Sequence, residues 1–564
     1  MSKALKITII VIASVLVLLA LGLGLGLGLR QNEQPETEVL TLNVDGDNVK
    51  RIQLEPGDNV YSYIAENVTE YTDYNTCGWF IEDTLTMPLT EDITIAEDEN
   101  ITIYTRTATL DKLSFTLNDD ETTYSVSASS EDISGEVVVP KMYTNESTSG
   151  LVTEVAENGF SKDSESPYRN NLTLAVLPNS IETIGTQAFY YNFSMAFINI
   201  PYGVTTIGDE AYRSCYSVNS ITIPSTVESI GTNSFRIAGL AEVYNYSTFD
   251  IELGSTDNGY AGYYTKVVYN ASDLVNDKPE SRVKTIGNVS YYVYGDDFIA
   301  LAPTESRATL KEVVLDERTT EINNFAFNYC TALESINMPE NVKKLGATAF
   351  QNCESLSTAI VIPEGVTEIG NYTFNNCRKL PSVTIPSTVT SIGNYAFTYC
   401  ANLTYINIPS TVTSIGNYAF NRSGLQSIYI PDSVTSIGMW AFAWCEEMSE
   451  IRISENITTL EEATFQHTNI STITIPQSVE TFGMAVFNGC ASLEEVVFEN
   501  KFTTISQGLF LNCSSLKQIT IPESVTTIES NAFQGTALES ITIPANITDI
   551  AGNAFWSCNE IKTV

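Results

Sequence analysis

A repeat of about 23 residues recurs along most of this chain, and it constrains the fold more than any other feature. Its consensus is I-x-I-P-x-x-V-T-x-I-G-x-x-A-F-x-x-C-x-x-L, and residues 406–425 (INIPSTVTSIGNYAFNRSGL) are a clean copy. One copy is too short to bury its own apolar side chains, whereas stacked copies bury them against one another. The chain is therefore expected to form a solenoid. The proline slot is filled at Pro140, Pro178, Pro201, Pro224, Pro339, Pro363, Pro386, Pro409, Pro431, Pro476, Pro522 and Pro544, and in weaker copies by Asp316, Ser454 and Glu499.

The alternation inside one copy predicts which side chains face the core. In residues 403–408 (LTYINI), a period of two sends the apolar residues inward and Tyr405 and Asn407 outward. Proline then ends the strand, because it has no N–H to donate to a ladder. Gly416 is expected to permit a turn, and Phe420 to return the chain to the core.

A period of 20–29 residues with one short strand per copy is the signature of a leucine-rich repeat. The string I-P-x-x-V-T-x-I-G-x-x-A-F-x-x-C resembles the BspA-type repeat of bacterial and protist surface proteins over roughly 400 residues. Residues 111–160 are similar to the lead-in that precedes such arrays, and residues 247–312 resemble a second lead-in. This resemblance implies a role in adhesion or binding at a cell surface.

Residues 41–106 resemble, more weakly, the small β-grasp repeat of internalin-type proteins. The matching elements are Gly57 in a turn, Gly78-Trp79-Phe80 as an aromatic core, and Ile101–Tyr104 as the last strand. Cys77, directly before the second glycine, departs from the pattern of that family.

The N-terminus carries a targeting signal. Lys3 and Lys6 precede an apolar run over residues 7–29 that contains no charged residue, and Arg30 closes it. The run is long enough to span a bilayer and longer than the apolar part of most secretory signals, although a cleaved signal peptide and a secreted product remain the alternative. Because basic residues favour the cytoplasmic side, we expect a single-pass cell-membrane protein with its C-terminal bulk outside the cell.

Together these features predict a mostly β chain: a leucine-rich-repeat solenoid of BspA type with small β domains, preceded by one N-terminal transmembrane helix. The expected divisions are a cytoplasmic stub and signal anchor at 1–30, a linker at 31–40, a β-grasp-like domain at 41–108, a lead-in and first repeat block at 109–246, a β insertion at 247–312 and a second repeat block at 313–564.

Charge and histidine content narrow the functions. The chain has 68 Asp and Glu against 28 Lys and Arg, a net charge of −40, so nucleic acid is not an expected partner. His467 is the only histidine, which removes most Ser/His, Cys/His and multi-His metal mechanisms. The sequence does not formally exclude catalysis by a pair of acidic residues, as in glycosidases. We predict no catalysis, no metal and no cofactor.

Nine of the ten cysteines occupy one slot, three residues after the conserved aromatic, where other copies carry Asn192, Ser423, Thr468 or Thr536. A slot that accepts these four residue types favours a small, buried side chain and free thiols over disulfides. The nine are Cys215, Cys330, Cys353, Cys377, Cys400, Cys445, Cys490, Cys513 and Cys558.

Asn-x-Ser/Thr sequons are frequent, and in a eukaryotic host several would carry glycans. The candidate sites are Asn67, Asn100, Asn145, Asn171, Asn245, Asn270, Asn288, Asn371, Asn402, Asn421, Asn456, Asn469 and Asn546.

The outward strand positions are mostly small, uncharged residues, except in three consecutive copies. There the exceptions are Tyr405, Asn407, Tyr429, Glu450 and Arg452. Because Tyr and Arg are enriched at interaction hot spots, we predict that these residues contact an extracellular protein or glycan ligand. The alternative is a structural coat or spacer protein without a specific ligand, in which Tyr merely suits an exposed strand.

Overall fold

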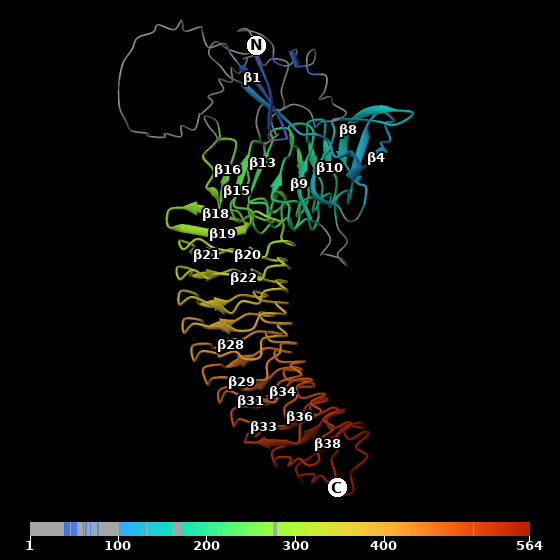
Figure 1. Ribbon diagram of the computed structural model, residues 1–564. Helices are drawn as coiled ribbons and strands as arrows, with labels where there is room; N and C mark the ends of the chain where they lie inside the picture. The colour runs from blue at the N-terminus through green and yellow to red at the C-terminus, as the bar shows by residue number, and fades with distance from the viewer. Residues whose placement is uncertain are drawn as a thin grey trace, which may run out of the picture.

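The computed structural model describes residues 39–45, 47–53, 60, 63–64, 68, 76–77, 101–130, 133–161, 171–274, 279–499 and 501–563. Repeat coils stack into two arrays that meet near the hairpin of β18 (Val289–Tyr294) and β19 (Asp297–Pro303), and the second array curves away to the C-terminus (Figure 1). The repeat solenoid predicted from the sequence is confirmed. The apolar run at 7–29 lies outside the described residues. Within the described ranges, no helix has the length and apolar character that a membrane span requires.

A three-stranded sheet precedes the arrays. It contains β1 (Val39–Val44), β2 (Asp47–Gln53) and β3 (Ile101–Thr105) in the order β2-β1-β3, with β2 antiparallel and β3 parallel to β1. The glycines and the Trp-Phe pair that carried the β-grasp resemblance lie outside the described residues, so that assignment remains a prediction.

Each coil contributes up to two short strands to two parallel ladders. The proline-side strands, which precede the proline slot, are β6 (Ser134–Val138), β9 (Asn171–Val176), β11 (Phe197–Ile198), β13 (Ser220–Ile223), β15 (Glu242–Asn245), β16 (Val267–Tyr269), β20 (Glu312–Val313), β22 (Ser335–Ile336), β24 (Ile360–Val361), β26 (Val383–Thr384), β29 (Ser427–Tyr429), β31 (Glu450–Arg452), β33 (Thr472–Ile475) and β35 (Glu495–Phe498). The glycine-side strands are β8 (Ser149–Val155), β10 (Thr183–Ile184), β12 (Thr206–Ile207), β14 (Ser229–Ile230), β21 (Glu321–Ile322), β23 (Lys344–Leu345), β25 (Glu368–Ile369), β27 (Ser391–Ile392), β28 (Ser414–Ile415), β30 (Ser436–Ile437), β32 (Thr459–Leu460), β34 (Thr481–Phe482), β36 (Thr504–Ile505), β37 (Thr527–Ile528) and β38 (Asp549–Ile550).

Both arrays begin with an antiparallel hairpin. In the first, β4 (Leu113–Leu117) pairs with β5 (Tyr124–Ala128), and β5 then lies parallel to β8, which also pairs with β7 (Met142–Thr144). In the second, β17 (Val283–Ile286) pairs with β18, and β19 lies parallel to β21. Residues 247–312 therefore supply β16 to the first array as well as the starting hairpin of the second. Single 3-10 turns lie at Leu110–Lys112 and Asn258–Tyr260.

A column of buried aromatic rings runs through each array. In the second array, consecutive phenyl rings from Phe327 to Phe555 stack at centroid distances of 5.2–5.8 Å. In the first array, Phe189, Tyr212 and Phe235 continue the same pattern. Each ring packs against the next coil, so no coil completes its core alone.

The cysteine slot is a hydrogen-bonding position as well as a small one. Eight of these thiols donate to the carbonyl of the conserved aromatic in the preceding coil, with Sγ–O distances of 3.0–3.3 Å. At the same slot, Asn192 Nδ2 donates to the carbonyl of Phe160 at 2.9 Å. The slot thus favours a small residue that carries a donor, and this explains why Cys alternates with Ser, Thr and Asn.

The conserved glycine is required by close approach rather than by a left-handed turn. A Cβ on Gly416 would lie 2.6 Å from the backbone nitrogen of Asn394 in the preceding coil. The left-handed backbone lies further on, at Tyr418 (φ 56°) and Arg422 (φ 57°). Gly416 therefore permits stacking, and the turn itself is made by residues with side chains.

Arg307 joins the two arrays. It is 1% exposed, and its Nε donates to Ser217 Oγ (2.9 Å) while Nη2 donates to the carbonyl of Tyr216 (3.2 Å), both in the first array. Nη1 donates to the carbonyls of Phe325 (3.2 Å) and Asn328 (2.7 Å) in the second array. Since one rigid guanidinium bonds to both arrays, it fixes their relative position.

The buried hydroxyl of Tyr212 leads to a prediction. Tyr212 occupies the position of the aromatic column that phenylalanine fills in the two neighbouring coils. Its oxygen has no hydrogen-bond partner among the described residues. We expect Tyr212→Phe to raise the free energy of unfolding by about 1 kcal/mol, because it removes an uncompensated desolvation cost. Urea unfolding measures the change, with Phe235→Tyr as the converse variant, which should destabilise. A loss of stability in Tyr212→Phe would show that the hydroxyl is satisfied.

Alkaline pH should destabilise the solenoid. Burial raises the pKa of the thiols of Cys400 to about 12 and of Cys445 and Cys490 to about 11. An unfolded thiol ionises near pH 8.5, so between about pH 8.5 and 11 only the unfolded chain releases these protons, and each thiol costs up to ~1.4 kcal/mol per pH unit. Urea midpoints measured from pH 7 to 11 should fall steeply.

A matched control tests the cause of that fall. The triple variant Cys400→Ser, Cys445→Ser, Cys490→Ser keeps a donor in each slot but cannot ionise in this range. Its urea midpoint should decline less with pH than that of the natural chain. Equal slopes would assign the alkaline effect to other groups.

Candidate ligand-binding face

The outward positions of the proline-side strands lie where the alternation predicted. Tyr405 and Tyr429 are 58% and 57% exposed, and Asn407 and Glu450 are also exposed. The intervening Ile406 and Ile428 are buried, and Ile451 is half-buried. Arg452 is half-buried. All five residues therefore reach the surface of neighbouring coils.

The register brings only part of this set together. β29 and β31 pair in parallel so that Tyr429 lies opposite Arg452 and Ser427 opposite Glu450. The Arg452 guanidinium lies over the Tyr429 ring, 4.7 Å from its centroid. Tyr405 belongs to the coil before, and no ring contact joins it to Tyr429 in the described part of the chain. The predicted patch is thus a Tyr429–Arg452 pair with Tyr405 as a separate aromatic beside it.

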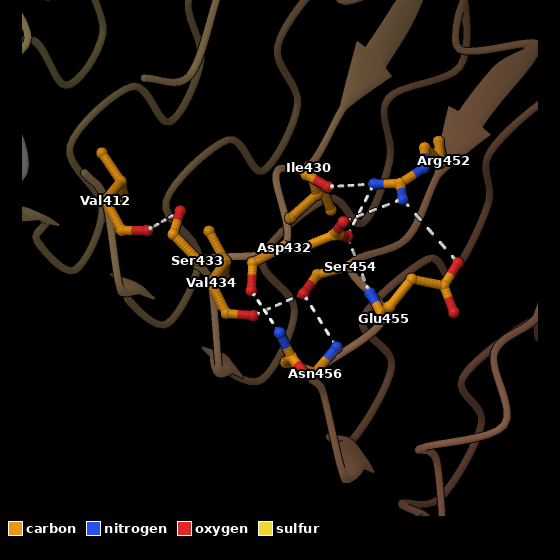
Figure 2. Close-up of polar contacts among 9 residues, drawn as sticks. All are labelled: Val412, Ile430, Asp432, Ser433, Val434, Arg452, Ser454, Glu455 and Asn456. Atoms are coloured by element: carbon orange, nitrogen blue, oxygen red, sulfur yellow. Dashed lines mark hydrogen bonds and ion pairs between the residues drawn. The ribbon is translucent and has the colours of Figure 1, made fainter. Parts of the chain in front are cut away.

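Arg452 is held in place by an acidic residue that the strand pattern did not include. Nη1 and Nη2 donate to the two carboxylate oxygens of Asp432 at 2.8 and 3.2 Å, and Nη1 also reaches the carbonyl of Ile430 at 3.2 Å (Figure 2). This pairing lowers the pKa of the Asp432 carboxyl. The same carboxylate accepts from the backbone nitrogen of Glu455 at 3.1 Å. The bidentate contact orients the guanidinium before any ligand arrives.

Asp432 follows the proline slot rather than preceding it, so its side chain belongs to a turn in the sequence pattern. It lies 20 positions from Arg452, and only the stacking of coils places the two together. One feature of the sequence points to this contact: the residue after Pro431 is acidic, whereas the two preceding copies have serine at that position.

A second set of aromatic side chains lies on the turns, at the first left-handed position of four consecutive coils. Their rings stack in the order Tyr372, Tyr395, Tyr418 and Trp440, with centroid distances of 4.6, 4.7 and 5.9 Å. These rings present their edges to solvent, because each face is covered by the next ring.

The second left-handed position of the same region carries another stack. The Arg422 guanidinium lies 5.6 Å from the Tyr399 ring centroid and 4.7 Å from that of Trp444. Trp444 in turn stacks on His467 at 3.9 Å. The stack ends at Gly489, where a Cβ would lie 2.4 Å from the His467 ring. His467 lies in a turn and is half-buried, with Trp444 stacked on its ring.

Both stacks occupy positions where other coils carry asparagine or glycine, such as Asn376, Asn531 and Gly508. A left-handed backbone destabilises a non-glycine residue by roughly 1–2 kcal/mol. One aromatic contact stabilises by about 0.5–1.5 kcal/mol, which offsets much of that cost. The aromatic residues of both stacks recur two and six residues after the repeat glycine. This spacing is visible in the sequence, but the alternation of the strands does not predict it.

The structure sorts the sequons by burial. Asn245 and Asn421 are buried, which does not favour a glycan at either position in the folded chain. Asn371, Asn402 and Asn469 are exposed, and in the described part of the chain no hydrogen bond uses their side-chain nitrogen. Asn456 and Asn546 are exposed but donate this nitrogen to backbone carbonyls. Asn67 and Asn100 lie outside the described residues.

No group of three or more His, Cys, Asp or Glu side chains that could hold a metal ion is present within the described ranges. Burial raises the pKa of thiols such as Cys400 and makes them inaccessible, which does not favour nucleophilic chemistry at those positions.

Comparison with known proteins identifies the repeat. The BspA type leucine rich repeat region matches residues 163–253, 305–423, 367–494 and 440–562, which together exceed half of the chain. No curated protein is similar enough in sequence to count as a relative.

Several solved structures are similar to this chain. A leucine-rich repeat protein from Bacteroides ovatus is 19% identical with a TM-score of 0.36, and the match covers 80% of this chain and 92% of that one. A leucine rich cell surface protein from Faecalibacterium prausnitzii is 20% identical with a TM-score of 0.32, covering 80% and 92%. A leucine-rich repeat protein from Eubacterium ventriosum is 20% identical with a TM-score of 0.36, covering 78% and 95%.

The stack on His467 generates a prediction. Burial has the largest effect and lowers the pKa of the His467 imidazole below 6.5. Nearby Glu446 raises this pKa, and Arg422 lowers it by a smaller amount. Because the fold favours the neutral ring, His467 stabilises the native state above pH 6.5, and that stability is lost as pH falls through its lowered pKa.

The imidazole signals of this single histidine can be followed by NMR without assignment. They should titrate below pH 6.5 in the natural chain and closer to 6.5 in Trp444→Leu, which removes the covering ring. A natural chain that titrates at or above 6.5 would contradict the stacked geometry.

Proposed function

The chain belongs to the BspA-type leucine-rich-repeat family, and from this premise we propose that it is a cell-surface binding protein or adhesin for an extracellular protein or glycan. The observation that carries the proposal is the oriented pair of Tyr429 and Arg452 on a strand face of small polar residues. An exposed ring and a fixed guanidinium provide an apolar surface and directed donors at one point, as hot spots do. Ordering before binding reduces the entropic cost of association.

We further propose that the run at 7–29 anchors the chain in the cell membrane, with the repeat arrays outside the cell. Its length and the flanking lysines support this orientation. The net charge of −40 supports an extracellular, soluble array that does not bind nucleic acid. The accessible sequons at Asn371, Asn402 and Asn469 are compatible with the same exposure.

The ligand contact is tested by removing the patch without changing the fold. In the triple variant Tyr405→Ser, Tyr429→Ser, Arg452→Thr, the new residues are small and polar like most outward residues of other coils, so stability should change little. The chain is used to capture ligand from host-cell or matrix extract, and binding of the captured ligand should weaken by at least about 1–2 kcal/mol in the variant.

The control is Thr472→Ser, Thr474→Ser, which changes the outward pair of a neighbouring coil and should leave the affinity unchanged. Equal affinities of the triple variant and the natural chain would exclude the patch as the contact. A chain that captures no saturable ligand would favour the alternative, a structural coat or spacer.

A further inference from the structure

A pocket lies at the junction of the two arrays, apart from the patch described above. Its volume is about 330 Å³. One wall is the outward face of β11 and β13 in the first array, including Phe197, Ser220 and Thr222, and the other is the hairpin that begins the second array, including Thr285 and Ser290. The hairpin covers the first array where the coils change direction (Figure 1).

The lining of this pocket is polar and uncharged. None of the residues that line it is Asp, Glu, Lys, Arg or His, although the chain as a whole carries a net charge of −40. Phe197 and Val283, both half-buried, supply apolar surface, one from each wall, whereas the side chains of Ile198 and Ile221 point into the core. A charged ligand would lose its hydration here without gaining an ionic partner, so the pocket selects against charge.

Five hydroxyl groups around this pocket are unused by the protein. Those of Ser220, Thr222, Thr285, Ser290 and Thr304 have no hydrogen-bond partner within the part of the chain that the structure describes.

The side chain of the adjacent residue Asn219 is 8% exposed, and its buried oxygen also has no hydrogen-bond partner in the described part of the chain. Thr285 and Thr304 are exposed, whereas Asn219, Ser220, Thr222 and Ser290 are buried or half-buried, where polar groups normally find partners. The unpaired groups of these four residues around one space indicate an occupant that supplies partners.

The walls are fixed in place. Tyr291, Phe298 and Ala300 of the hairpin pack into the core of the second array, whereas Tyr292 and Leu301 pack against the last strands of the first. Both faces of the hairpin are thus buried, and Arg307 beside it donates hydrogen bonds to both arrays. The pocket is formed before a ligand arrives.

We propose that this junction pocket binds a single neutral sugar unit. A pyranose ring combines hydroxyl groups with an apolar C–H face, which matches unpaired hydroxyls together with the side chains of Phe197 and Val283. The volume lies at the lower end of the range for small-ligand pockets, about 300–1,000 Å³, which suits one such unit rather than a polymer. The site is independent of the Tyr429–Arg452 patch.

The test is ligand-observed NMR of the full chain with the methyl glycosides of glucose, galactose, mannose and N-acetylglucosamine, and with glucuronate as the charged comparison. At least one neutral sugar should show saturable binding, with a Kd on the order of 1 mM, and glucuronate should show none. Thr222→Val, Thr285→Val removes one hydroxyl from each wall while keeping side-chain shape, and should weaken binding at least tenfold. Thr285→Trp fills the space and should abolish it.

Two controls separate this site from the patch. Thr384→Val, Thr474→Val alters matched outward threonines of the second array, and Tyr405→Ser, Tyr429→Ser, Arg452→Thr removes the patch; both should bind the sugar as the natural chain does. The proposal is overturned if no neutral sugar binds at about 50 mM, which would mean that water fills the pocket, or if binding survives Thr285→Trp.

Discussion

Stacking of identical coils through a buried aromatic column is the interaction on which the rest of this structure depends. From Phe327 to Phe555 each ring packs on the next at 5.2–5.8 Å, and in seven of these coils a thiol donates to the backbone carbonyl of the preceding phenylalanine. These two contacts fix both the spacing and the rotation of successive coils. Every inward position is therefore determined by its neighbours, and glycine is required wherever two backbones come within reach of a Cβ, as at Gly416.

The same constraint explains what happens where the repeat is interrupted. A solenoid cannot simply stop, because its last coil would expose an apolar edge. The hairpin of β17, β18 and β19 buries one face in each array, and Arg307 satisfies carbonyls from both. Stacking of Phe193 on Tyr329 at 4.3 Å continues the contact across the junction. The two arrays thus behave as one body with a fixed bend, and the bend creates the pocket.

Only side chains that point away from the column are free to differ between coils, and function must reside there. In the stretch from Tyr372 to His467, three outward rows depart from their neighbours: the strand face and the two left-handed turn positions. Aromatic residues at left-handed positions are tolerated because they stack on one another. These rows lie in the same few coils, which indicates that this part of the second array is specialised relative to its ends.

The sequence by itself determined the repeat register, the inward and outward sets, and the outward exposure of Tyr405 and Tyr429. These follow from local periodicity, which a single copy displays. The tertiary structure decided the partnership of Arg452 with Asp432, the turn stacks and the junction pocket. Each of these joins residues about one coil apart or, across the junction, residues of two different arrays such as Thr222 and Thr285. Such contacts depend on how coils stack and where the arrays meet, and the pattern within one copy carries no information about either.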